Sequence, residues 1–76
     1  MSVTLSRQGG DLKIEFDSVV KYFSLLDLEI SIESDFVYFQ DGSFIDFNDV
    51  VSPSVSSAED LADQIGLFIY QLTTGA

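Results

Sequence analysis

Almost all of the side chains in this protein that could take part in chemistry are carboxylates. The 76 residues include 13 Asp and Glu against three Lys and Arg, with no His and no Cys, so the formal net charge is −10. Without an imidazole or a thiol, neither a Ser-His-Asp nor a Cys-His catalytic arrangement can form, and zinc lacks its preferred ligands. The composition therefore favours a protein that is not an enzyme and holds no cofactor.

Several carboxylates occur at the spacing of a β-strand. Residues 26–33 alternate between two sets, Leu26, Leu28, Ile30 and Ile32 on one side and Asp27, Glu29, Ser31 and Glu33 on the other. This period predicts a strand with an aliphatic face and an acidic face formed by Asp27, Glu29 and Glu33. Residues on one strand face lie about 6.8 Å apart, close to the spacing of phosphates along a nucleic-acid strand. The acidic face could imitate DNA, or it could provide solubility and block edge pairing.

Oxygen ligands for a hard cation occur in the segment 41–49. Asp41, Asp46, Asn48 and Asp49 supply the carboxylate and amide oxygens that Ca²⁺ prefers. The EF-hand pattern is absent, and Asp41-Gly42 fits a hairpin turn better than a metal loop. We therefore predict no metal site within the chain, and a divalent ion shared between subunits is a separate hypothesis.

The elements that must position these residues begin with a hairpin over residues 2–17. Gly9-Gly10 is a two-residue turn signal. It predicts that Arg7 pairs with Leu12, Leu5 with Ile14 and Val3 with Phe16, so that the apolar residues share one face with the stem of Arg7.

Residues 18–25 fit two structures. Val19, Tyr22, Phe23 and Leu26 match a helical stripe, whereas the Val-Val-Lys-Tyr-Phe run has high strand propensity. The composition favours a strand or an irregular connection and leaves the helix open.

A second hairpin is predicted over residues 36–47, with Asp41-Gly42 as its turn. This turn pairs Phe36 with Phe47 and Tyr38 with Ile45 on the predicted core face. The other face then carries three apolar residues, Val37, Phe39 and Phe44. Because a small domain has few elements to cover both faces, we predict that these three residues contact a partner protein.

A C-terminal helix is predicted over about residues 57–72. Ser56 with Glu59, or Ser57 with Asp60, gives a capping box. An apolar stripe at helical spacing follows, formed by Ala58, Leu61, Ile65, Phe68, Ile69 and Leu72. Gly75 is the predicted stop signal. Together these elements predict one α+β domain, a small antiparallel meander of four or five strands packed with one helix.

The overall composition limits the partners. The chain is 46% hydrophobic and contains seven Phe and three Tyr, which is typical of a folded protein. Its negative charge repels nucleic acid and anionic membranes. No basic segment precedes an apolar run, and no run is long enough to span a membrane. We expect neither a signal peptide nor a membrane or direct nucleic-acid partner.

The stretch from Phe36 to Ile65 resembles short structural proteins of bacteriophages. It combines an aromatic hairpin, the turn Asp-Val-x-Ser-Pro at 49–53, and the helix start Ser-x-Glu-x-Leu-x-x-x-Ile at 57–65. The resemblance implies a virion or assembly component that packs against copies of itself or against a larger structural protein, with no catalytic residues.

Two functions follow as hypotheses. The first is a non-enzymatic structural protein that is homo-oligomeric and located in a virion, or otherwise in the cytoplasm. The alternative is an acidic inhibitor that mimics DNA and blocks a DNA-binding enzyme.

Overall fold

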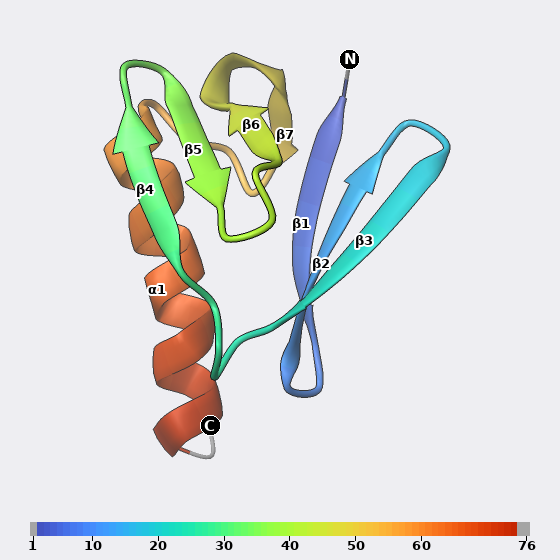
Figure 1. Ribbon diagram of the computed structural model, residues 1–76, viewed down its shortest axis with the longest axis vertical. Helices are drawn as coiled ribbons and strands as arrows, with labels where there is room; N and C mark the ends of the chain where they lie inside the picture. The colour runs from blue at the N-terminus through green and yellow to red at the C-terminus, as the bar shows by residue number, and fades with distance from the viewer. Residues whose placement is uncertain (1, 75–76) are drawn as a thin grey trace.

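The computed structural model describes residues 2–74, which form two β-sheets and one helix (Figure 1). The first sheet has the strand order β3-β2-β1-β7 and the second the order β4-β5-β6. The elements are β1 (Val3–Gln8), β2 (Asp11–Phe16), β3 (Val19–Ser24), β4 (Ile30–Glu33), β5 (Phe36–Phe39), β6 (Phe44–Asp46), the 3-10 helix η1 (Phe47–Asp49), β7 (Val50–Ser52) and α1 (Ala58–Thr74). The predicted α+β class is confirmed, but the described strands number seven and do not form a single meander.

The first hairpin has the predicted register. Leu5 pairs with Ile14 and Val3 with Phe16. Gly9, the first residue of the two-residue turn, has φ +62°, a conformation that glycine adopts without steric cost. The ambiguous residues 18–25 contain the strand β3, which pairs antiparallel with β2. On the other side of β1 lies β7, in parallel.

The predicted strand 26–33 is wrong in its first half. The strand begins only at Ile30, and the preceding residues form a turn and an irregular segment. Leu26, predicted to lie on the aliphatic face of this strand, is 73% exposed, whereas Leu25 is 2% exposed. The Gln40 side chain holds this segment, since it accepts a hydrogen bond from the Glu29 backbone N–H at 3.2 Å and donates one to the Asp27 carbonyl at 3.5 Å.

The second hairpin is shifted by one residue from the predicted register. Val37 pairs with Ile45 and Tyr38 with Phe44, so the predicted pairs of Tyr38 with Ile45 and Phe36 with Phe47 are wrong. The loop has three residues, because the Gly42 N–H donates to the Phe39 carbonyl and the Phe39 N–H donates to the Ser43 carbonyl. Gly42 adopts φ +88°, which suits the last position of such a loop.

The loop length decides which face of the second hairpin is buried. A shift of one residue moves every side chain of a strand to the opposite face. Ile45 therefore joins Val37 and Phe39 in the core, and Phe44 joins Phe36 and Tyr38 on the outward face. The Asp41 carboxylate stabilises the loop by accepting hydrogen bonds from the backbone N–H and the hydroxyl of Ser43.

The helix agrees closely with its prediction. Ser57 caps it, since its hydroxyl oxygen accepts a hydrogen bond from the Asp60 N–H at 3.0 Å, and Asp60 in turn accepts one from the Ser56 N–H. The predicted stripe packs into the core: Ala58, Leu61 and Ile65 are buried, and Phe68, Ile69 and Leu72 lie against them. Gly75, the predicted stop, lies outside the described residues.

The core lies between the two sheets and the helix. Figure 1 shows α1 alongside β4 and β5, with β1, β2 and β3 on the opposite side of the molecule. Phe23 of β3 stacks on Phe39 of β5, with ring centroids 4.9 Å apart and planes 12° apart. This stack joins the inner faces of the two sheets.

Candidate functional site

An apolar groove of about 430 Å³ opens between the two sheets. It lies where β1, β2 and β3 approach β5 and β6, so residues far apart in the sequence form its walls. These residues are Val3, Phe16 and Val19 from the first sheet, Phe36, Phe44, Ile45 and Asp46 from the second, and Asp49 from η1. The groove is thus mostly hydrocarbon with two carboxylates, a composition typical of binding sites.

A cluster of three aromatic rings borders this groove on the outward face of β5 and β6. Phe44 is 50% exposed and makes a T-shaped contact with Phe36, with ring centroids 5.4 Å apart. Tyr38 lies 5.5 Å from Phe44 and 6.3 Å from Phe36. We call Phe36, Tyr38 and Phe44 the aromatic cluster. The observed register creates it, because the loop places Phe44 directly opposite Tyr38.

The two groove carboxylates come from the last residue of β6, Asp46, and from η1, which follows it. Asp46 caps η1, and its Oδ1 accepts hydrogen bonds from the backbone N–H and the side-chain amide of Asn48, each at 2.9 Å. Both bonds fall on Oδ1, and they fix the orientation of the carboxylate. Asp49 lies at the end of the same turn. None of the residues that line the groove is a Lys or an Arg.

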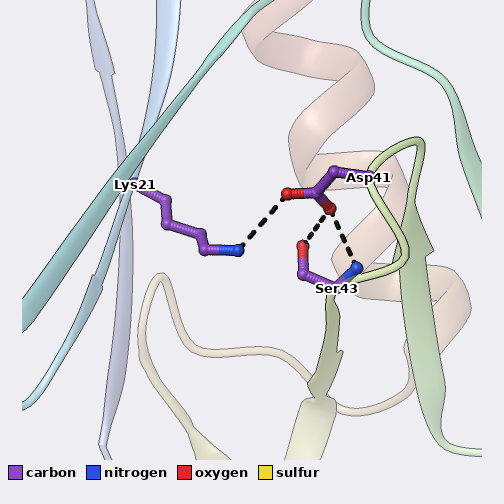
Figure 2. Close-up of polar contacts among 3 residues, drawn as sticks. All are labelled: Lys21, Asp41 and Ser43. Carbon is purple, nitrogen blue, oxygen red and sulfur yellow. Dashed lines mark hydrogen bonds and ion pairs between the residues drawn. The ribbon is translucent and has the colours of Figure 1, made fainter.

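The three cations of the chain lie elsewhere. Lys21 Nζ reaches from β3 to Asp41 Oδ2 at 3.3 Å, as Figure 2 shows. Lys13 pairs with Glu15 at 3.3 Å on β2, and Arg7 donates to the Gly9 carbonyl at 3.1 Å in the first turn. The groove carboxylates are therefore not neutralised by the residues that line the groove.

Asp41 has a structural role at the tip of the second hairpin. Hydrogen bonds from the Ser43 hydroxyl and backbone N–H, together with the nearby Lys21 ammonium, lower the pKa of Asp41 from 3.8 to about 2 (Figure 2). This ion pair and the Phe23–Phe39 stack both connect β3 to the second hairpin. Asp41 thus holds the loop that sets the register of the aromatic cluster.

The predicted contact residues are divided between two faces. Phe44 is on the outward face, but Val37 is 0% exposed and Phe39 is 5% exposed, so the prediction that these two are available to a partner is corrected. The cause is the one-residue shift of the hairpin. The sequence pattern placed Phe36 and Tyr38 in the core. The missed signal was Gln40-Asp41-Gly42, which suits a three-residue loop with glycine at its last position.

The predicted acidic row does not form on a strand. Asp27 lies in the turn after β3 and Glu29 in the irregular segment before β4, so of the three only Glu33 belongs to a strand. Glu33 pairs with Phe36 and therefore lies on the same outward face as the aromatic cluster. The regular spacing on which DNA mimicry depended is absent from this segment.

Across residues 2–74 there is no group of three or more acidic side chains placed to hold a metal ion. In the same range, no helix combines the length and the apolar character needed to cross a membrane. No family model matches the chain, and neither a curated protein nor a solved structure shows significant similarity to it. The groove and the aromatic cluster are therefore the features of the structure that bear on function.

Proposed function

We propose that this protein is a non-enzymatic interaction protein that docks on a larger protein through the aromatic cluster and the adjoining groove. The observation that carries the proposal is the half-exposed Phe44 at the centre of three rings beside an apolar groove. Aromatic side chains at the centre of a surface patch are the residues that contribute most to protein interfaces. The resemblance of residues 36–65 to bacteriophage structural proteins supports the role of a small structural subunit.

The charge favours a different protein over a second copy as the partner. Each copy carries a net charge of −10, so two copies repel one another at low ionic strength. Two carboxylates also line the groove, and they would face the acidic surface of a second copy. The homo-oligomer expected from the sequence is therefore the less favoured arrangement.

A capture experiment with matched variants tests the proposal. Wild-type protein and the variants Phe44→Asp and Leu26→Asp are immobilised. Each is incubated with the structural proteins of the virion that the bacteriophage resemblance implies for this protein, and bound proteins are identified by mass spectrometry. Leu26 is a suitable control because it is also a large exposed apolar residue but does not line the groove. We expect a partner that wild type and Leu26→Asp retain equally and that Phe44→Asp loses.

Light scattering on the same three preparations reveals self-association. A defined oligomer that Phe44→Asp dissociates would show that a second copy occupies the surface. Equal capture by Phe44→Asp and wild type would refute the proposal, provided that circular dichroism shows both to be folded.

A further inference from the structure

We infer that the groove receives a Lys or Arg side chain of the partner, carried beside an apolar residue on the same segment. This inference rests on the proposed docking function and specifies the chemistry of the partner. It follows from three properties of the site, which are the partly exposed aromatic cluster, the carboxylates that no lining cation neutralises, and the apolar walls.

The aromatic cluster offers a surface that attracts cations. The faces of aromatic rings carry negative potential, and a Lys or Arg within about 6 Å of a ring centroid is attracted to it. Phe44 meets Phe36 edge to face, and Tyr38 is tilted by 40° to Phe44, so the planes of the three neighbouring rings differ in orientation. An arrangement of this kind suits the planar guanidinium of Arg or the compact ammonium of Lys.

The carboxylates of the groove complete the site for a cation. Asp46 and Asp49 line the groove together with Phe44, and Glu33 lies on the same outward face through its pairing with Phe36. The ring contacts and the charges therefore act from one side of the molecule. The hydrogen bonds from Asn48 already orient Asp46, so little ordering is needed when a cation binds.

The apolar walls explain why the cation must come with an apolar neighbour. Val19, which is 54% exposed, contributes accessible hydrocarbon to a groove of about 430 Å³, which is within the size range of sites for small ligands, whereas Val3 and Ile45 line the groove with only 1% exposure each. A single ammonium group would leave Val19 in water. A partner segment with one aliphatic side chain between the sheets and one cation over the rings would occupy both the apolar part of the groove and the aromatic cluster.

A second copy could supply few such cations. Lys13 and Lys21 are already paired with Glu15 and Asp41, which leaves Arg7 as the side chain most readily offered. Arg7→Gln therefore identifies self-docking: loss of an oligomer in this variant would show that the groove takes Arg7 of a second copy, which would support its preference for a cation and overturn the choice of a different protein as the partner.

Titration with short peptides tests the inference directly. The probes are a Leu-Arg-Leu-Arg peptide and its Leu-Gln-Leu-Gln counterpart, blocked at both ends, and binding is followed by ¹⁵N chemical shifts of the folded protein. We expect the Arg peptide to bind at least about tenfold more tightly, with shifts at Phe44, Asp46 and Asp49, and its affinity to fall as salt is raised.

Two conservative variants separate the contributions of the rings and the charges. Phe44→Leu keeps apolar volume but removes a π-face, and Asp49→Asn keeps shape but removes a charge. Each should lower the binding affinity of the Arg peptide by roughly three- to tenfold and leave the affinity of the Gln peptide unchanged. Tyr70→Leu and Glu59→Gln, exposed positions on the helix, are the matched controls and should have no effect.

Equal affinity for the two peptides, or equal affinity of Phe44→Leu and Tyr70→Leu for the Arg peptide, would overturn the inference. The outcome is distinguishable from failure of the docking proposal. If Phe44→Asp still loses the captured partner while the peptides bind equally, docking stands and is apolar. If Phe44→Asp retains the partner, the docking proposal itself fails.

Discussion

Replacing Phe39 or Phe44 by Ala tests the register of the second hairpin. In the register that the sequence predicted, the two residues face each other on one side of the sheet, so their substitution by Ala should lower the free energy of unfolding by similar amounts. In the structure they lie on opposite faces, with Phe39 in the core and Phe44 half exposed. The two substitutions should therefore differ strongly in their effect on the free energy of unfolding.

The expected magnitudes follow from burial and ring contacts. Truncating a buried Phe to Ala costs about 3–5 kcal/mol, and the loss of the stack on Phe23 places Phe39→Ala in the upper part of this range. Phe44→Ala removes about half of the burial of a Phe and two ring contacts, or roughly 1–2 kcal/mol. A domain of this size has a total stability of roughly 4–11 kcal/mol, so Phe39→Ala leaves a small margin.

Urea denaturation followed by circular dichroism measures the difference. A gap of about 3 kcal/mol between the variants corresponds to roughly 12–24 °C in melting temperature. If Phe39→Ala does not fold, Phe39→Leu retains most of the apolar volume and should lose about 1–2 kcal/mol through the missing stack. Equal losses for Phe39→Ala and Phe44→Ala, or a larger loss for Phe44→Ala, would refute the observed register.

Three further predictions concern single positions. Asp41→Asn should lower the free energy of unfolding at neutral pH. Because the pKa of Asp41 is lowered in the folded state, the difference in free energy of unfolding between variant and wild type should be complete above about pH 3.8 and should disappear as the pH falls through about 2. Urea curves at both ends of this range measure it, and coincident curves at neutral pH would contradict it. Ser34→Gly should raise the free energy of unfolding by about 1 kcal/mol or less, since Ser34 has φ +57°, and a lower melting temperature would count against this strain. Leu25→Ala should cost about 2–5 kcal/mol and Leu26→Ala less than about 0.5 kcal/mol, and the reverse order in thermal melts would show that the turn after β3 is misplaced.

Parts of the fold were predictable because local signals and burial agree there. Gly9-Gly10 and the alternation of Leu5, Ile14 and their neighbours specify one register, since a slip would expose the whole apolar face. The helix was predictable from the Ser57–Asp60 cap and its apolar stripe. The segment 26–29 was not, because alternation alone cannot distinguish a strand from a turn that buries Leu25 and exposes Leu26.

The sequence by itself determined the absence of His and Cys, the net charge of −10, the first hairpin and the helix. It could not determine which face of the second hairpin is buried. Both faces of that hairpin are apolar, so hydrophobic burial does not discriminate between registers one residue apart. The tertiary structure decides through contacts distant in sequence: Phe23 stacks on Phe39, and Lys21 pairs with Asp41 beside the three-residue loop. The candidate site exists only as a consequence of that choice, because it brings Phe44 outward against Phe36 and Tyr38.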